Sequence, residues 1–446
     1  MMVVMVVVLG CDQGAAAPTD GALAVDAAAG CPALTGAVVS HMQDVSADEA
    51  WAGDGTLHTI DFGITVRPGA TLTLDGCAVV QIAGGLVVTV AGDAARPARL
   101  IARGTADRPV TIGRKDPSRA WTQLRALCET CLLDLSSTTV EGGGAAGGAM
   151  IALRGASDPL TVQKTLRAVS LTMKGATNSA LWLERGAAFT DDSTSITVTG
   201  GGPAGMAWGG DLVATPRALA TLPPMVAIHD NQQDVIRVVD QSLQIERDLT
   251  LRDVGVPYYF VFDRVRVHST TATPRLTIEA GVELQLDDYL LVGLAGTPNQ
   301  AGVLTVSGTA ARRVRFTSSK PTHAAGEWPG LWLSVADGST IAHATIEAAG
   351  GANGIVSANC KPAMSSDRAA LMLGGLTASR YLPAAADFTD VVIAASASHG
   401  INAMWTSASF GPDVSGGFSF DGLAGCRQTK NGRTTGCGAE AGCLVP

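Results

Sequence analysis

Hydrophobic and polar residues alternate in short runs over much of the chain, and small polar turns separate the runs. In residues 276–278, 282–286, 304–306 and 314–316, apolar residues recur at every second position. A period of two residues is typical of β-strands with one buried face. Most gaps between the runs are rich in Gly, Asp or Asn and too short for a crossover helix. The pattern predicts an all-β chain of strands about 4–6 residues long.

The chain contains an internal repeat. Residues 72–112 align without a gap with residues 276–316, at an offset of 204 residues, and 13 of these 41 positions are identical. A register held over this length predicts an internal duplication. Many short strands with small turns can form a sandwich, a barrel or a solenoid. The duplication and the regular glycine-rich turns favour a parallel β-helix, in which stacked coils place apolar residues in inward ladders.

The repeat also carries a family resemblance. The second copy reads LTIEAGVELQL, then GVLTVSGTAARRVRFTSSK, GEWPGLWL and STIAHATIEAAGG. This series resembles the repeat of bacterial surface lipoproteins with a right-handed parallel β-helix, over roughly residues 56–208 and 257–405. Ala280 and Gly76 stand where that family has proline. The resemblance implies a right-handed β-helix of two homologous halves, and it is specific for fold rather than activity.

Composition narrows the possible partners. With 53 glycines, 4% aromatic and 16% charged residues, the chain suits tightly turning coils, and its 446 residues can bury a large core. The formal net charge is −9 and no basic run is present. Nucleic acids, whose binding needs clustered Lys and Arg, are therefore excluded as expected partners.

The first ten residues are apolar, and Val8-Leu9-Gly10 precedes Cys11. This ending resembles the lipobox of bacterial lipoproteins, in which the cysteine becomes the lipidated first residue. The resemblance implies export and a lipid anchor in the bacterial cell envelope, at the outer membrane or cell surface. No Lys or Arg precedes the run, which is short for a signal peptide, so we expect the true start upstream. A buried N-terminal strand is the alternative; a spanning helix would need about 20 residues.

These features give a predicted organisation. We expect a lipoprotein signal peptide at 1–10, the lipidated Cys with a flexible tether at 11–35, a first β-helix half at 36–213, a joint or entry segment at 214–262, a second half at 263–425, and a Cys-rich cap at 426–446. The joint permits either one continuous solenoid or two shorter stacks. We favour two lobes, because the second copy restarts with its entry segment.

Cysteine usage fits an oxidising compartment. Eight cysteines remain besides Cys11, an even number: Cys31, Cys77, Cys128, Cys131, Cys360, Cys426, Cys437 and Cys443. We expect Cys31–Cys77, Cys128–Cys131 and two bridges among the last four. The Cys-x-x-Cys pair could instead bind zinc or act in redox chemistry, but a second ligand pair and a βαβ context are missing.

Candidate catalytic groups are sparse. The doublets Asp191-Asp192 and Asp287-Asp288 would point to opposite faces on a strand, so we interpret each as a charged turn rather than a carboxylate pair. Glu141 and Glu347 occupy equivalent places in the two copies. The seven His residues show no metal-ligand spacing. No cofactor is predicted, although calcium would suit an eliminative polysaccharide site.

Aromatic and basic residues supply the possible ligand contacts. Trp208 and Trp405 end equivalent segments and are candidates for a carbohydrate-stacking face. Together with Trp182, Trp328 and Trp332 they could instead fill the core, which we favour. An arginine group could contact an anionic glycan or discourage edge pairing: Arg103, Arg108, Arg312, Arg313 and Arg315.

The sequence therefore predicts an exported, lipid-anchored surface protein with a structural or binding role toward a glycan, the matrix or a partner protein. No catalysis is assigned. The alternative is a polysaccharide lyase or glycoside hydrolase whose carboxylates converge from separate coils.

Overall fold

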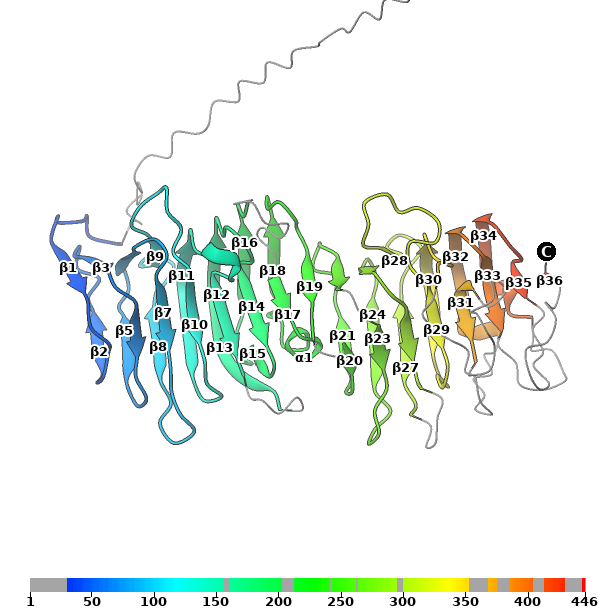
Figure 1. Cartoon of the computed structure of the whole chain (residues 1–446), viewed down its shortest axis with the longest axis horizontal. Helices are drawn as coiled ribbons and strands as arrows, with labels where there is room; N and C mark the ends of the chain where they lie inside the picture. Colours follow the sequence, from blue (N-terminus) through cyan, green and yellow to red (C-terminus); the bar gives the residue numbers. More distant parts are fainter. Residues whose placement is uncertain are drawn as a thin grey trace, which may run out of the picture.

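The computed structural model describes residues 30–155, 161–202, 212–240, 243–261, 264–294, 300–352, 368–374, 385–403, 413–429 and 443–445. Its strands form three long sheets of 12, 16 and 8 strands. The strands lie side by side along the long axis, from β1 to β36 (Figure 1). The all-β prediction is confirmed, and the long parallel sheets are compatible with a parallel β-helix.

The 12-stranded sheet contains β1 (Val38–His41), β2 (Glu49–Trp51), β3 (Leu57–Ile60), β5 (Thr71–Leu74), β6 (Val79–Ile82), β8 (Arg99–Arg103), β9 (Val110–Arg114), β11 (Leu132–Glu141), β13 (Gln163–Lys174), β15 (Ala187–Phe189), β16 (Ser195–Thr199) and β18 (Met225–His229). The 16-stranded sheet contains β4 (Ile64–Val66), β7 (Val87–Val90), β10 (Gln123–Ala126), β12 (Ile151–Arg154), β14 (Leu181–Glu184), β17 (Leu212–Ala214), β19 (Ile236–Val238), β21 (Leu249–Leu251), β22 (Tyr258–Phe260), β24 (Arg275–Glu279), β25 (Glu283–Leu286), β27 (Val303–Ser307), β28 (Val314–Ser318), β30 (Thr340–Glu347), β32 (Phe388–Ser396) and β34 (Phe418–Leu423). The 8-stranded sheet contains β20 (Gln244–Ile245), β23 (Val265–Val267), β26 (Leu290–Val292), β29 (Leu331–Leu333), β31 (Ala369–Leu373), β33 (His399–Ala403), β35 (Gln428–Thr429) and β36 (Cys443–Val445).

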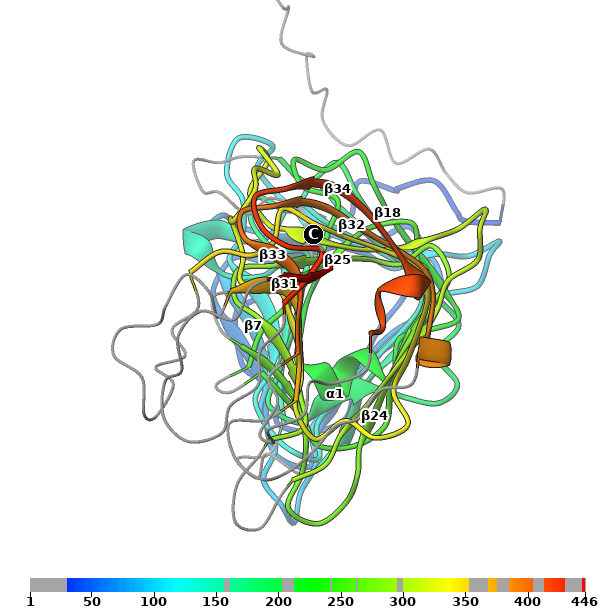
Figure 2. The ribbon, with the colours of Figure 1, turned by 90° about the vertical axis from the view of Figure 1, so that its right-hand side faces the viewer.

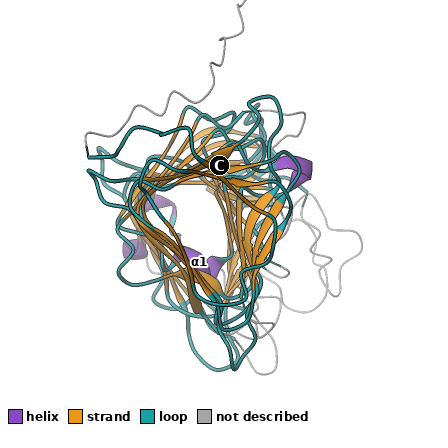
Figure 3. Cartoon of the chain, turned by 90° about the vertical axis from the view of Figure 1, so that its left-hand side faces the viewer, coloured by secondary structure: helices purple, strands orange, loops and turns teal. Residues whose placement is uncertain are grey.

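The chain contributes to the sheets in a repeating order. β5, β6 and β7 are followed by β8, β9 and β10, and each later strand pairs in parallel with its counterpart three strands earlier. We call each such set of three strands a coil. β11 and β13 are longer because each turns a corner, with Ser137 and Ser170 at φ 39° and 53°. Viewed from the N-terminal end, the strands surround a common interior (Figure 3).

Apolar side chains fill this interior. One cluster of buried hydrophobic residues extends from Val45 to Val414, through both halves of the chain. It is continuous because alternate residues of every strand point inward and the parallel register stacks them on the same position of the next coil. A smaller cluster lies on the outward side of the 8-stranded sheet, where Tyr289 and Trp332 pack edge to face with ring centroids 5.8 Å apart.

Strand bounds repeat at the offset of the sequence alignment. β6 and β25, β8 and β27, and β9 and β28 have the same lengths and are displaced by 204 residues, the offset of the sequence alignment. Beyond the aligned stretch, the indole Nε1 of Trp121 donates to the Glu141 carbonyl at 2.9 Å, and that of Trp328 donates to the Glu347 carbonyl at 2.7 Å. Both indoles are fully buried. The two halves therefore share the same corner construction.

The two halves are joined by a continuous ladder. β14, β17, β19, β22 and β25 pair in parallel, one after another, through the expected joint segment. Of the two arrangements that the sequence left open, this ladder fits the continuous one. The equivalent strands nevertheless change sheet: β6 lies in the 12-stranded sheet, whereas its counterpart β25 lies in the 16-stranded sheet. The second half is thus displaced by one face relative to the first.

A short helix occupies the place where this displacement occurs. Helix α1 (Pro216–Leu219) begins after Thr215, whose Oγ1 accepts from the Ala218 amide at 3.4 Å. Its side chains Ala218 and Leu219 are buried, and it lies between β15 and β21 inside the ring of strands (Figure 2). The other helical segments of the described residues are 3-10 turns at Ala145–Gly147, Ala385–Asp387 and Ser415–Gly417. Within the described ranges, no helix is long and apolar enough to cross a membrane.

The two ends of the stack are built differently. At the C-terminal end, β36 pairs antiparallel with β35, and a Cys426–Cys443 disulfide holds it there. At the N-terminal end, the rings of His41 and Trp51 stack with centroids 3.7 Å apart. His58 Nε2 lies 3.0 Å from the Ala52 carbonyl and must donate to it, so His58 Nδ1 accepts from His41 Nε2, also at 3.0 Å.

This ring stack predicts a loss of stability in mild acid. Burial lowers the pKa of His41, and His58 lowers it further, whereas Glu49 opposes them. Because the folded-state pKa lies below the unfolded value near 6.5, the unfolded chain binds the proton more readily. Stability is therefore complete above about pH 6.5 and falls as the pH drops toward the folded pKa. Burial lowers the pKa of His268 in the same direction.

The measurement is a thermal unfolding midpoint at several values between pH 7.5 and pH 5.5, where the lowered carboxyl pKa values of Asp44 and Asp61 do not yet contribute. We expect the midpoint to fall with pH, and the fall to be shallower in His41→Gln. An equal slope in both proteins would contradict the assignment to His41.

Candidate ligand-binding face

The outward side of the 16-stranded sheet carries one file of side chains that runs through both halves. Strand pairing places one of its residues on each successive coil: Thr65, Thr89, Arg125, Ala152, Trp182, Val213, Arg237, Tyr259, Gln285 and Thr317. Successive strands in a sheet are about 4.8 Å apart, so the file places side chains at this regular spacing. Val213, Tyr259 and Thr317 are buried within it.

The centre of the file combines an indole and a guanidinium. Trp182 lies between Leu181 and Leu183, which are buried in the core, and its own ring is partly exposed on the outer side. Two strands further, Arg237 donates from Nη2 to the Ser179 hydroxyl at 2.9 Å. Val213 stands between them in the ladder. The arrangement offers an apolar ring face beside hydrogen-bond donors.

Tyr259 follows Arg237 in the file, and its hydroxyl contacts the carboxylate of Asp287. Its hydroxyl donates to Asp287 Oδ2 at 2.9 Å, and the Ser319 hydroxyl donates to the other oxygen of the same carboxylate. Burial and the neighbouring Asp287 raise the pKa of Tyr259 to about 12, so the phenol stays protonated and acts as a donor at neutral pH. Asp287 is thereby fixed in orientation.

A charged network continues the face on β25, β28 and β30. Arg315 donates to Glu283 Oε2 at 2.8 Å and to Glu347 Oε1 from Nε at 3.0 Å. The Thr317 hydroxyl, itself fully buried, donates to Glu347 Oε1 at 2.9 Å and lies 3.0 Å from His323 Nδ1. One arginine thus holds two glutamates in place across neighbouring coils, and the carboxylates retain lone pairs for further donors.

The arginines expected to meet an anionic glycan are engaged within the protein. Arg312 pairs with Asp253, and Arg313 donates to Asp390 Oδ2 at 2.5 Å. Arg315 is held by the two glutamates, and Arg108 donates to the Gly76 carbonyl at 3.2 Å. Arg103 is exposed at the end of β8. Arg108, Arg312, Arg313 and Arg315 are thus bound within the protein, and for these four the interpretation as outward structural residues fits better than an anion site.

In each aspartate doublet the two carboxylates contact different partners, as expected for adjacent residues. Asp191 pairs with Lys164, whereas Asp192 accepts from Arg167 Nε at 2.5 Å, and this hydrogen bond lowers the pKa of Asp192. In the second doublet Asp287 faces Tyr259, whereas Asp288 lies 3.6 Å from Arg264. Neither doublet forms a two-carboxylate site. Glu141 and Glu347 do occupy equivalent corners, with their carbonyls bound by the indoles described above.

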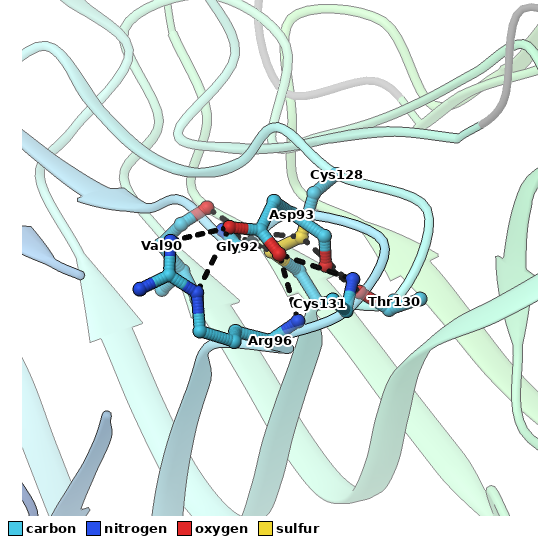
Figure 4. The surroundings of a disulfide bond; sticks show 8 residues. Val90, Gly92, Asp93, Arg96, Cys128, Thr130 and Cys131 are labelled. Carbon is cyan, nitrogen blue, oxygen red and sulfur yellow. Dashed lines mark hydrogen bonds and ion pairs between the residues drawn. A yellow bond between two sulfur atoms is a disulfide. The ribbon is translucent and has the colours of Figure 1, made fainter. Parts of the chain in front are cut away.

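The structure pairs Cys31 with Cys77 and Cys128 with Cys131, the pairings that the sequence suggested, and Cys426 with Cys443. The Cys128–Cys131 bridge packs against the turn after β7 (Figure 4). The Gly92 amide lies 3.3 and 3.2 Å from the two sulfurs, and the Thr130 hydroxyl donates to the Asp93 carbonyl at 3.0 Å. A Cβ on Gly92 would lie 2.7 Å from the Ala98 amide nitrogen, so this turn requires glycine. These contacts suit a structural bridge.

The other candidate residues lie in the core, on another sheet or outside the described residues. Trp328 is a core residue, and Trp332 is 6% exposed on the outer side of its sheet, where its Nε1 donates to the Gly374 carbonyl at 2.7 Å. The remaining named candidates lie outside the described residues: Cys11, Trp208, Cys360, Trp405 and Cys437. Among the residues that the structure describes, no group of three His, Cys, Asp or Glu could hold a metal ion.

Searches of protein-family models, curated proteins and solved structures find no match to this chain.

Sequence reasoning favoured a core role for Trp182, whose ring is instead partly exposed, and it named neither Arg237 nor Tyr259. Each stands between two buried apolar residues of a three- or four-residue strand, in the sequences LWL, IRV and YYF. This local signal marks an outward residue. It does not reveal that the three share a ladder, because strand pairing across about 20–55 residues is a property of the stack.

The disulfides differ in the length of chain that they close, which predicts different stabilities. Cys31 and Cys77 are 46 residues apart, whereas Cys128 and Cys131 are 3 apart. The loop-entropy model gives about 4 kcal/mol for the first bridge and about 1.5 kcal/mol for the second. We expect chemical denaturation to show the larger loss in Cys31→Ser/Cys77→Ser, with Cys128→Ser/Cys131→Ser as the matched comparison. Equal losses would contradict the entropic account.

Proposed function

We propose that this chain is an exported, lipid-anchored protein of the bacterial cell surface, built as a right-handed parallel β-helix of two homologous halves, and that it binds a neutral polysaccharide. The outward file of the 16-stranded sheet supports the binding role. It aligns Trp182, Arg237, Tyr259 and Gln285 on a rigid ladder in a regular file.

The chemistry of this face suits sugars. The ring of Trp182 provides an apolar plane against which the C–H face of a sugar can pack. Arg237 supplies donors, and the carboxylates of Asp287, Glu283 and Glu347 accept from hydroxyl groups. Successive coils lie about 4.8 Å apart, comparable with the length of one sugar unit in an extended polymer. An extended chain can therefore contact several coils at once.

Electrostatics favours a neutral polymer over an acidic one. The protein carries a formal net charge of −9. On the face itself, Arg315 pairs with two glutamates, Glu283 and Glu347, so this cluster carries one negative charge in excess. This excess of negative charge would repel an anionic polymer.

The binding role is tested by pull-down of the full chain with neutral and acidic polysaccharides of matched length. We expect retention on one or more neutral polymers, and at least a tenfold weaker affinity in Trp182→Ala, which corresponds to about 1.4 kcal/mol. Phe62→Ala is the control, because Phe62 is an exposed aromatic residue, 57% accessible, that follows β3 of a different sheet. Equal binding by Trp182→Ala and the unmodified protein would overturn the assignment of this face.

The lipid anchor is tested separately, by fractionation of bacteria that express the chain. We expect the unmodified protein in the membrane fraction and Cys11→Ser in the soluble fraction, with an intact mass that reports acyl groups on the former alone. Cys128→Ser/Cys131→Ser controls for loss of a cysteine elsewhere. Membrane association of Cys11→Ser with an unchanged mass would contradict lipidation at Cys11.

A further inference from the structure

Nearly all of the net charge of this protein resides in its first 66 residues. This stretch contains eight acidic residues and no Lys or Arg: Asp12, Asp20, Asp26, Asp44, Asp48, Glu49, Asp54 and Asp61. The whole chain has 40 acidic and 31 basic residues, so the remaining 380 carry 32 and 31, a net charge of −1. The charge is therefore concentrated at the N-terminal end of the stack.

Part of this acidity is uncompensated. Asp44 pairs with Arg67, and Asp61 pairs with Lys115 at 2.5 Å. Among the described residues, no Lys or Arg lies within ion-pair distance of three other carboxylates of the first coil: Asp48, Glu49 and Asp54. Their hydrogen bonds come from the amides of Thr71 and Thr56 and from the Trp51 indole.

The same end also exposes apolar side chains. Five of the eight large hydrophobic residues that are exposed in the described structure lie between residues 34 and 62: Leu34, Val38, Val39, Met42 and Phe62. Val38 and Val39, which belong to β1, are 58% and 44% exposed. A cluster of this kind on one end of a protein marks an interaction surface.

β1 also offers a free hydrogen-bonding edge. It pairs in parallel with β3 on one side, and within the described residues no strand pairs with its other side. Within the described residues β18 and β34 also pair on one side only, but β1 combines its free edge with the cluster of exposed apolar side chains. Unpaired strand edges are templates for addition of another strand.

A disulfide and a set of ring contacts fix the position of β1. The Cys31–Cys77 disulfide ties the preceding segment to the turn between β5 and β6. His41, the last residue of β1, stacks on Trp51 and bonds to His58. An edge fixed in this way can accept a strand without first becoming ordered, which reduces the entropic cost of binding.

We propose that the free edge of β1 docks an extended, basic segment of a partner protein, which adds a strand with alternating apolar and cationic side chains. Adjacent strand residues point to opposite faces, so its apolar residues pack beside Val38. Its Lys or Arg residues lie on the other face, with Val39 and His41, and meet Glu49, which is 3.7 Å from His41. Charge excludes the two other occupants. A second copy brought end to end would oppose two acidic surfaces, and the chain's own residues 1–29 bring three more aspartates and no cation.

The probe is a short fluorescent peptide in which Lys and Val alternate, compared with its Glu–Val counterpart, and its binding to the full chain is followed by anisotropy. We expect the Lys–Val peptide alone to bind, and the affinity to fall as salt is raised. Val38→Lys should weaken binding at least tenfold. Met225→Lys is the matched control, because Met225 is 61% exposed on β18, the other terminal strand of the same sheet, and should change the affinity by less than about twofold.

Other outcomes would overturn the proposal. Equal weakening by both lysine variants, or equal binding of both peptides, would show a non-specific interaction. Dimerisation in sedimentation analysis that Val38→Lys abolishes would identify a second copy as the occupant. Amide protection of Val38–His41 that the peptide does not increase would identify the chain's own tail. Thermal midpoints of the two variants close to that of the unmodified protein are the check that both are folded.

Discussion

Every other feature of this protein depends on parallel pairing in register between successive coils. Because the side-chain period along a strand is two, each inward residue rests on an inward residue of the next coil, and each outward residue on an outward one. A single polar residue in an inward file would be buried without a partner, whereas a polar residue in an outward file can reach solvent or a polar neighbour. The interior is accordingly one apolar cluster through both halves.

This difference between inward and outward positions explains which residues differ between the two aligned segments. Inward positions keep apolar residues in both aligned segments, as in Leu72 and Leu276, which are 1% and 0% exposed. The outward position Thr111 corresponds to Arg315 at the same offset of 204 residues. In the first half Thr111 leads a file of hydroxyl groups with Thr139, Thr172 and Thr197, whereas Arg315 organises two glutamates. Between these two aligned segments the buried position is thus unchanged, whereas the outward position differs.

The sequence predicted the positions of the strands better than it predicted which strands pair with each other. Alternation and the repeat located β6 and β25 within a residue, because both signals are local. The corners were not predicted, because Ser137 and Ser170 adopt positive φ, for which serine carries no strong signal. The binding face could not be predicted either. Trp182, Arg237 and Tyr259 are separated in sequence and come together only through the order in which strands pair, which the alternation leaves open.

The displacement by one face at α1 has a consequence for avidity. A duplicated surface strengthens binding to a polymer only if one chain can reach both copies at the same time. Here β6 and β25, which occupy equivalent places in the sequence alignment, lie in different sheets, so the equivalent surfaces of the two aligned segments point to different sides of the stack. The internal repeat therefore does not give the protein two equivalent sites that one polymer chain could occupy together. Its longest uninterrupted surface is a composite, formed by non-equivalent strands of the two halves, and its recognition properties belong to neither copy alone.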